Sequence, residues 1–586
     1  MELRARVNMM RCSHRLLCSL FLAAALFGVA AAATRRHDWD ISYQFTSPDC
    51  VRKLAVTING HTPGPTIRAV QGDTIVVNVK NSLLTENVAI HWHGIRQIGT
   101  PWADGTEGVT QCPILPGDTF AYTFVVDRPG TYMYHAHYGM QRSAGLNGMI
   151  VVEVAPGAAG DGEREPFRYD GEHTVLLNDW WHRSTYEQAA GLASVPMVWV
   201  GEPQSLLING RGRFVNCSSS PATAASCNVT HPDCAPAVFA VVPGKTYRFR
   251  IASVTSLSAL NFEIEGHEMT VVEADGHYVK PFVVKNLNIY SGETYSVLIT
   301  ADQDPNRNYW LASNVVSRKP ATPTGTAVLA YYGGRRNSPR ARPPTPPPAG
   351  PAWNDTAYRV RQSLATVAHP AHAVPPPPTS DRTILLLNTQ NKIGGQIKWA
   401  LNNVSFTLPH TPYLVAMKRG LLGAFDQRPP PETYAGAAAF DVYAVQGNPN
   451  ATTSDAPYRL RFGSVVDVVL QNANMLAANS SETHPWHLHG HDFWVLGHGA
   501  GRFDPAVHPA AAYNLRDPIM KNTVAVHPFG WTAIRFRADN PGVWAFHCHI
   551  EAHFFMGMGI VFEEGVDRVG DLPPEIMGCG KTRGGH

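Results

Sequence analysis

The chain has 586 residues, a formal net charge of +2 and 44% hydrophobic residues. Because one hydrophobic core does not organise a chain of this length, we expect about three or four domains. The near-neutral charge, without long basic runs, excludes the electrostatic footprint of a protein that binds nucleic acid or an anionic membrane.

Residues 1–33 predict a secretory signal peptide. The stretch MELRARVNMMRCSHRLLCSLFLAAALFGVAAAAT begins with arginines, continues in a short alanine-rich apolar run and ends in small residues that suit cleavage near Ala33. No later segment approaches about eighteen continuous apolar residues, so we expect a secreted protein without a membrane-spanning segment.

Six N-x-[ST] sequons agree with passage through a glycosylating secretory pathway, although such triplets also arise by chance. We expect these to be glycosylation acceptors, located in surface segments of the secreted chain. They lie at Asn216, Asn228, Asn354, Asn403, Asn450 and Asn479.

Residues 34–160, 161–336 and 379–586 predict three β-sandwich domains, with residues 337–378 as a Pro-rich, extended linker between the second and the third. Each domain contains alternating, β-branched stretches bounded by Gly, Pro and Asn, as expected for strands of half-buried sheets. Examples are GDTIVVNVKN, GKTYRFRIAS and GSVVDVVLQN, whereas helical periodicity is scarce. The sequence therefore predicts an all-β protein.

The first and third domains carry matching histidine motifs. DRPGTYMYHAHYG at 127–139 aligns without gaps to DNPGVWAFHCHIE at 539–551, and IHWHG at 90–94 matches WHLHG at 486–490. The second domain has a stretch of similar strand character at 292–313, GETYSVLITADQDPNRNYWLAS, but it contains no His-x-His. We therefore expect the second domain to hold no metal.

A His-x-His motif on a strand is a ligand pair, because residues i and i+2 point to the same face and place two imidazoles side by side. With 26 histidines in the chain, chance predicts roughly one such pair, so a single motif is weak evidence. Here the pairs recur in matching repeat positions. They are His91 and His93, His135 and His137, His487 and His489, and His547 and His549.

These imidazoles would suffice for two zinc ions, but all-histidine sites beside a Cys–His–Met site would be unusual for zinc. Copper suits both sets of ligands, because imidazole and thiolate are ligands that it accepts readily. The pattern therefore favours copper over zinc.

Cys548 lies in the stretch AFHCHIEAHFFMGMGIVF, and one interpretation is a buried structural thiol beside a core histidine. However, an electron-transfer copper typically takes two His, one Cys and a weak axial Met. Cys548, His553 and Met558 supply three of those ligands. His484, three residues before the first histidine pair of the third domain, is the candidate for the fourth.

The tripeptide around Cys548 connects two predicted sites. Successive residues of a strand point to opposite faces. His547 and His549 therefore project toward the histidine cluster, while Cys548 projects the other way. Electrons that arrive at the Cys548 site would reach the cluster through a short covalent path.

The cysteine count supports a special role for Cys548. Nine cysteines are present, and Cys12 and Cys18 lie in the signal peptide. In an oxidising compartment six of the seven others can pair, and the one left over is either a liability or a functional thiol. Cys548 is the candidate for that functional thiol.

The four blocks HWHG, HAH, HPWHLHGH and HCHIEAHFFMGM resemble those of the blue multicopper oxidases, across essentially the whole mature chain. Within that family, WADGTEGVTQCPI, GEPQSLLINGRG, VVEADGHYV and HPWHLHGHDFWVLG are most similar to plant L-ascorbate oxidases. The resemblance implies three cupredoxin-like Greek-key sandwiches and an extracellular enzyme of the apoplast or cell wall. It also implies that L-ascorbate is oxidised while O2 is reduced to water. A homodimer is one assembly that the chain could form.

The resemblance further implies four coppers per chain. The type 1 copper would be bound by His484, Cys548, His553 and Met558. The type 2 copper would be bound by His91 and His487. The two type 3 coppers would be bound by His93, His135 and His549, and by His137, His489 and His547.

The family resemblance also implies three disulfides, Cys50–Cys234, Cys112–Cys579 and Cys217–Cys227, which leave Cys548 free. It suggests a proton-relay role for Asp104, whose alternative is a turn aspartate before glycine. It places Trp199 and Trp399 beside His553 in the substrate pocket, where each would otherwise be a plain core tryptophan.

Two competing functions remain open from the sequence. A laccase-like oxidase of phenols would share the copper ligands and differ only in its reductant. A secreted wall-associated relative without redox chemistry would keep the fold, but it would be expected to lose ligands that this chain retains.

Overall fold

The structure is a computed structural model that describes residues 32–155, 165–217, 221–332, 341–434 and 440–582. The predicted signal peptide lies outside these residues except for its last two, and so do the domain boundaries expected at 160 and 336. The division into domains therefore stays a prediction, and the sandwiches are named below by their strands.

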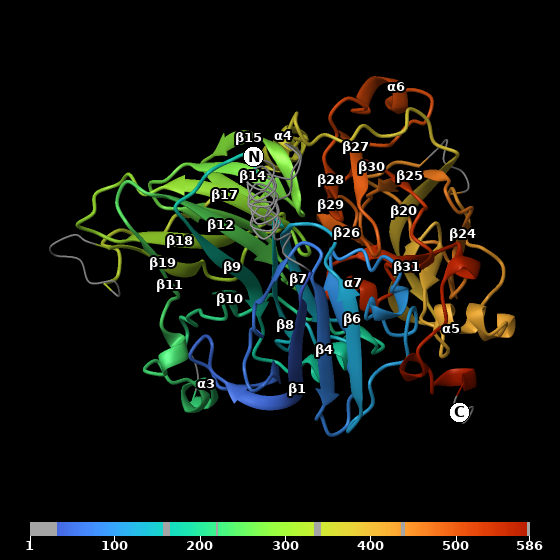
Figure 1. The fold of residues 1–586 in the computed structure, drawn as a ribbon, viewed down its shortest axis with the longest axis horizontal. Helices are drawn as coiled ribbons and strands as arrows, with labels where there is room; N and C mark the ends of the chain where they lie inside the picture. Colours follow the sequence, from blue (N-terminus) through green and yellow to red (C-terminus); the bar gives the residue numbers. More distant parts are fainter. Residues whose placement is uncertain (1–31, 156–164, 218–220, 333–340, 435–439, 583–586) are drawn as a thin grey trace, which may run out of the picture.

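Three pairs of sheets follow one another along the chain, which confirms the predicted all-β architecture of cupredoxin-like sandwiches (Figure 1). In the N-terminal sandwich, one sheet has the order β2-β1-β4-β6 and the other β3-β8-β7-β5. Its strands are β1 (Thr34–Thr46), β2 (Lys53–Ile58), β3 (Ile67–Val70), β4 (Thr74–Asn81), β5 (Ile90–His93), β6 (Thr119–Val125), β7 (Gly130–Ala136) and β8 (Asn147–Glu153).

The middle sandwich, green in Figure 1, pairs a sheet of order β10-β9-β12-β17-β14-β15 with one of order β11-β19-β18-β13-β16. Its strands are β9 (Gly171–Trp180), β10 (Ser205–Ile208), β11 (Val238–Val241), β12 (Thr246–Ser253), β13 (Ala259–Ile264), β14 (Met269–Ala274), β15 (His277–Val284), β16 (Asn286–Ile289), β17 (Thr294–Thr300), β18 (Tyr309–Val316) and β19 (Gly325–Tyr331).

The C-terminal sandwich pairs a sheet of order β23-β22-β21-β20-β25-β30-β27-β28 with one of order β24-β32-β31-β26-β29. Its strands are β20 (Arg382–Ile393), β21 (Gln396–Leu401), β22 (Val404–Phe406), β23 (Thr452–Ser454), β24 (Tyr458–Leu460), β25 (Val465–Gln471), β26 (His484–Leu488), β27 (Phe493–Ala500), β28 (Met520–Lys521), β29 (Thr523–Val526), β30 (Gly530–Arg537), β31 (Gly542–Cys548) and β32 (Gly559–Glu564).

The helices are short and lie in the connections between strands. The α-helices are α2 (Thr185–Leu192), α3 (Pro221–Ser226), α4 (Thr356–Ala365), α5 (Tyr413–Lys418), α6 (His508–Ala512) and α7 (Glu551–Phe555). The 3-10 helices are η1 (Pro101–Ala103), η2 (Pro232–Cys234), η3 (Leu422–Ala424), η4 (Val566–Arg568), η5 (Pro574–Ile576) and η6 (Gly580–Thr582). None of the helices in the described ranges has the length and apolar character needed to cross a membrane.

Part of the segment expected to be an extended linker is helical. Asp355 caps helix α4 by accepting a hydrogen bond from the backbone N–H of Tyr358. Gln362 of the same helix accepts from the backbone N–H of Asn288 at 2.8 Å, in strand β16 of the middle sandwich. Tertiary hydrogen bonds therefore hold a helix where the proline-rich composition alone favours an extended chain.

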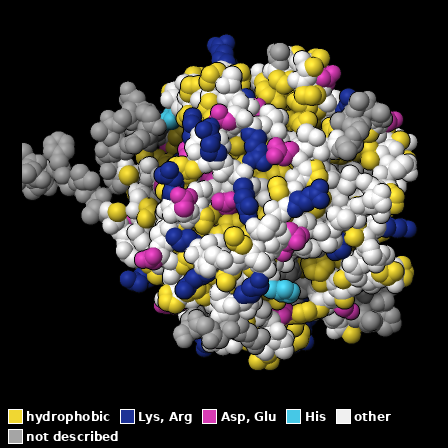
Figure 2. All heavy atoms as spheres, turned by 90° about the vertical axis from the view of Figure 1, so that its right-hand side faces the viewer, with side chains coloured by type: hydrophobic (Ala, Val, Ile, Leu, Met, Phe, Trp, Pro, Cys, Tyr) yellow, Lys and Arg dark blue, Asp and Glu magenta, His cyan; other side chains and the backbone are white. Residues whose placement is uncertain are grey.

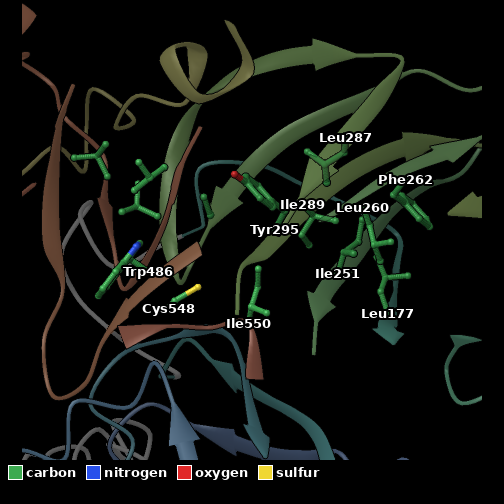
Figure 3. Packing of buried hydrophobic residues seen from close by; sticks show 14 of the residues in the cluster. Leu177, Ile251, Leu260, Phe262, Leu287, Ile289, Tyr295, Trp486, Cys548 and Ile550 are labelled. Atoms are coloured by element: carbon green, nitrogen blue, oxygen red, sulfur yellow. The ribbon is translucent and has the colours of Figure 1, made fainter. Parts of the chain in front are cut away.

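Buried side chains of the middle and C-terminal sandwiches form one continuous apolar cluster. Figure 3 shows Ile289 and Tyr295 of the middle sandwich and Cys548 and Ile550 of the C-terminal sandwich within it. The N-terminal sandwich has its own core, which includes the fully buried Trp92. Strand β31 thus ends in the packed junction between sandwiches.

The described residues form three disulfides, which are the pairings that the family resemblance implied. Cys50 is joined to Cys234, Cys112 to Cys579, and Cys217 to Cys227. The first two tie the N-terminal sandwich to the middle one and to the C-terminal tail. Cys548 is the one described cysteine outside a disulfide, and it is buried.

The surface carries charges of both signs. On the face in Figure 2, Lys and Arg side chains are interspersed with Asp and Glu among apolar and uncharged groups. The sequons differ in exposure: Asn403 is half-buried, whereas the other acceptor asparagines are exposed.

Candidate metal centre

Cys548 ends strand β31 and is fully buried between two histidines from other elements. Its Sγ lies 3.8 Å from Nδ1 of His484, which begins β26, and 3.7 Å from Nδ1 of His553 in α7. Met558 is also fully buried, and its carbonyl oxygen accepts the backbone N–H of Cys548 at 3.1 Å. The structure therefore brings together the four residues predicted for one site.

The eight histidines of the four His-x-His motifs meet where β5 and β7 of the N-terminal sandwich face β26 and β31 of the C-terminal sandwich. Within each sandwich, strand pairing sets the histidines opposite one another: His91 pairs with His135, and His487 with His547. Three triads made of histidines alone have ligand atoms within 4.8 Å of one another. They are His91, His93 and His487; His93, His135 and His549; and His137, His489 and His547.

Ring nitrogens of the cluster converge across the junction between the sandwiches. The Nε2 atoms of His91 and His487 are 3.2 Å apart, and those of His489 and His547 are 3.1 Å apart. Burial, together with repulsion from neighbouring imidazoles, lowers the pKa of His487 and His489 well below the usual range. The neutral rings therefore direct the lone pairs of their Nε2 atoms toward one another, an arrangement that a bound cation stabilises.

Most cluster histidines have one nitrogen fixed by a hydrogen-bond acceptor. A carbonyl or carboxylate oxygen near Nδ1 requires the hydrogen there, which leaves Nε2 as the ligating atom. Four of these acceptors are backbone carbonyls: that of Asp104 for His91 (2.8 Å), that of Ala136 for His135 (3.0 Å), that of Asn522 for His487 (2.8 Å) and that of Cys548 for His547 (2.9 Å). The fifth acceptor is the side-chain carboxylate of Asp104, which lies 2.9 Å from Nδ1 of His489.

His93 differs from these rings, because its Nε2 lies 3.0 Å from Thr523 Oγ1. Its buried Nδ1 has no hydrogen-bond partner among the described residues. An unpartnered polar atom is costly in a dry interior unless a ligand satisfies it. Together with the donor set of imidazoles and one thiol, this atom indicates that the residues fit copper.

Asp104, which follows η1, is fully buried between two cluster histidines. Its Oδ2 accepts hydrogen bonds from His489 Nδ1 at 2.9 Å and from Thr106 Oγ1 at 2.6 Å. Burial alone would raise the pKa of this carboxyl, but His91 and Thr106 outweigh that effect and lower it. Asp104 is therefore held as a carboxylate that orients His489.

The two predicted pocket tryptophans lie differently. Trp399 is fully buried, with its ring centroid 4.9 Å from that of His553 and 5.0 Å from that of His484. Trp199 is half-buried, and its ring centroid lies 6.2 Å from that of His553. Trp399 thus packs as a core residue against the Cys548 site, whereas Trp199 presents part of its indole to solvent.

Glu482 contacts the Cys548 site, although sequence reasoning missed it. Its Oε1 lies 3.1 Å from His553 Nε2, and its side chain is 14% exposed. Burial alone would raise the pKa of Glu482, but the bond from His553 dominates and lowers it to about 2. An acidic residue two positions before His484 was the available signal in the sequence.

A cavity of about 400 Å³ adjoins the histidine cluster and is lined by His135, His137, His547 and His549. Glu107 also lines it, and burial raises the pKa of this carboxyl to about 7. A cavity of this size accommodates O2 and several water molecules. Sequence reasoning missed Glu107, which lies three residues after Asp104.

This fold and these clustered histidines are those of a copper oxidase family. Three multicopper oxidase family models match residues 40–156, 171–334 and 424–568. An L-ascorbate oxidase of Brassica rapa subsp. pekinensis is 51% identical over 569 residues, which cover 96% of this chain and 97% of that protein. The chain belongs to the multicopper oxidase family.

More distant relatives agree with this assignment. Laccase-2 of Oryza sativa subsp. japonica is 37% identical over 572 residues, covering 93% of this chain and 94% of that protein. A crystal structure of Fet3p, a multicopper oxidase that functions in iron import, superposes with a TM-score of 0.73 at 26% identity, covering 93% of this chain and 94% of Fet3p. The chain is thus more similar to the ascorbate oxidase than to the laccase.

Proposed function

We propose that this protein is a secreted, copper-dependent oxidase that couples one-electron oxidation of L-ascorbate to the four-electron reduction of O2 to water. The observation that carries the proposal is the tripeptide 547–549, whose thiol belongs to one ligand group while its two histidines belong to two triads of the histidine cluster. The greater identity to an ascorbate oxidase, 51% against 37% for a laccase, supports ascorbate as the reductant.

The described residues would hold four coppers. Copper in these sites, when bound, supplies one-electron Cu(I)/Cu(II) chemistry and so stores the four electrons that O2 requires. His484, Cys548, His553 and Met558 would hold type 1 copper. His91 and His487 would hold type 2 copper. One type 3 copper would take His93, His135 and His549, and the other His137, His489 and His547.

At the reductant side, Glu482 fixes the ring of His553. Its carboxylate accepts the Nε2 hydrogen at 3.1 Å, which leaves Nδ1 to face Cys548 Sγ. Trp199, half-buried beside His553, offers a flat surface for a lactone ring.

At the oxygen side, the protein orients ligands and supplies protons. Asp104 holds His91 and His489 through the bonds described above, and we assign it a role in relaying protons to the cluster. The adjoining cavity admits O2 and water. The junction between the sandwiches keeps the reacting region away from bulk solvent, which prevents escape of partly reduced oxygen.

The location and organisation follow the same proposal. The predicted signal peptide and the exposed sequons support secretion to the apoplast or cell wall. We propose domains at 34–160, 161–336 and 379–586 with a linker at 337–378, and glycans at the exposed asparagines before any at Asn403. A homodimer remains one assembly to be tested by light scattering.

Steady-state oxygen uptake with ascorbate and with a simple phenol tests the proposal. Ascorbate should give the higher kcat/KM. A higher kcat/KM for the phenol would favour the laccase-like alternative. Absence of copper and of oxygen uptake with either reductant would favour a redox-inactive relative.

A further inference from the structure

One turn of the middle sandwich touches the histidine cluster, although the groups of ligating side chains in the described part of the chain include none from that sandwich. Residues 290–293 form this turn, which connects β16 to β17. We propose that the turn, through Ser291 and Gly292, holds His549 and His93 in the orientation in which they ligate metal. The proposal rests on the copper sites proposed above and assigns the turn a positioning role.

Ser291 selects the tautomer of His549. Its Oγ lies 2.8 Å from His549 Nδ1, and its hydroxyl hydrogen is donated to the carbonyl of Thr255. The hydroxyl oxygen is therefore free to accept the Nδ1 hydrogen of the imidazole. With that hydrogen in place, the lone pair lies on Nε2, which faces His135 Nε2 at 3.1 Å.

Arg142 lies close to both nitrogens of the same ring. Its Nη1 is 2.7 Å from His549 Nδ1 and 3.1 Å from His549 Nε2, and a guanidinium only donates hydrogen bonds. A hydrogen bond from Arg142 to Nδ1 would leave the hydrogen of the neutral ring on Nε2, where it blocks ligation. Because Ser291 is the one of these two neighbours that can accept a hydrogen bond, ligation by His549 depends on the serine.

Gly292 sets how closely the turn approaches both rings. Its φ is +87°, a backbone conformation that favours glycine. A Cβ at this position would lie 2.9 Å from His549 Cγ and 3.0 Å from His93 Cε1. Real Cβ atoms do not approach ring atoms so closely, so even alanine would displace a ring or the turn.

Buried charges fix the turn against the C-terminal sandwich. Lys521 of β28 places its Nζ 3.2 Å from Glu293 Oε1 in the turn and 3.4 Å from Asp275 Oδ2. Asp275 Oδ2 also accepts the backbone N–H of Thr523 at 3.1 Å. Since Thr523 Oγ1 lies 3.0 Å from His93 Nε2, the same buried ion cluster supports His93 from a second side.

Replacement of Gly292 tests the steric part of the proposal, with Gly244 as the matched control. Gly244 lies in another turn of the middle sandwich with φ +77°, but nothing lies within 4 Å of a Cβ built there. Gly292→Ala and Gly244→Ala therefore share the backbone strain and differ in the contact with the histidines. The copper-loaded full chain is measured for copper per chain, for blue absorption and for its EPR signal.

Gly292→Ala should lower copper per chain toward the content of the Cys548 site alone, or make the normally EPR-silent type 3 pair visible. Its blue absorption should persist, which also shows that the variant is folded. Gly244→Ala should match the wild type in all three measurements. Equal copper and EPR signals for the two variants would overturn the proposal, and a wild-type chain without copper would overturn the proposed function with it.

Ser291→Ala tests the tautomer argument and adds no atoms that could prevent folding. It should release copper to a chelator several-fold faster than the wild type, with the blue absorption unchanged. Ser291→Thr, which keeps the hydroxyl, should restore part of the slow release. Release from Ser291→Ala at the wild-type rate would show that the serine does not position His549.

Discussion

Trp199→Ala tests substrate binding without removing a core side chain, because the two predicted pocket tryptophans lie in different environments. Trp199 is half-buried beside His553, whereas Trp399 is fully buried. Loss of one aromatic contact costs about 0.5–1.5 kcal/mol beyond the buried area. We therefore expect KM for ascorbate to rise about 2- to 13-fold, with the blue absorption unchanged.

The same substitution at Trp399 should give a different result. Removing a fully buried indole typically costs about 3–5 kcal/mol of stability. Because this ring packs on His484 and His553, its loss should also change the blue absorption. Thermal unfolding and absorption spectra measure both effects.

The assay is oxygen uptake at varied ascorbate and at varied phenol. Val198→Ala serves as the control, because Val198 lies in the same loop and is 51% exposed. Phenol oxidation should suffer less than ascorbate oxidation in Trp199→Ala. Unchanged ascorbate kinetics, or equal losses for both reductants, would refute the role of Trp199 in binding.

Cys548→Ser should give a colourless protein that retains the other coppers, because the copper–thiolate bond gives the blue colour; a blue variant would contradict the type 1 assignment. Cys579→Ser should free one thiol at Cys112, detected by titration of the denatured chain, and lower stability by about 2–5 kcal/mol. Burial raises the pKa of Glu107 to about 7. The contribution of this carboxyl to folding stability is therefore full below its pKa in the unfolded chain, and it falls as the pH rises toward 7. Glu107→Gln should therefore lessen the fall in thermal stability between about pH 4.5 and 7, and an unchanged pH profile would contradict this account.

The sequence by itself determined the elements that depend on local pattern. Alternating β-branched stretches predicted strands, and His-x-His motifs on strands predicted paired ligands, because side chains two residues apart share a face. The one unpaired cysteine followed from counting, since six of the seven cysteines outside the predicted signal peptide can pair. The structure places Cys548 next to His484 and His553, as that reasoning required.

Only the tertiary structure decided how distant segments meet. The carboxylate of Asp104 orients His489 across 385 positions of sequence, and no local pattern specifies that pairing. The sequence left open whether Trp399 is a pocket or a core residue, because its burial depends on how β21 packs against the Cys548 site. Helix α4 forms within a proline-rich stretch because Gln362 and Tyr358 hydrogen-bond to Asn288 and Asn286 of the middle sandwich.

The turn at 290–293 shows the same division between local and tertiary information. Its sequence, YSGE, indicates a turn between two strands and gives no sign of metal. Its contact with His549 and His93 arises because three sandwiches converge on one point, and buried ion pairs hold the turn there. Short-range patterns specify strands and ligand types, whereas the geometry of contacts between sandwiches comes from packing of the whole chain.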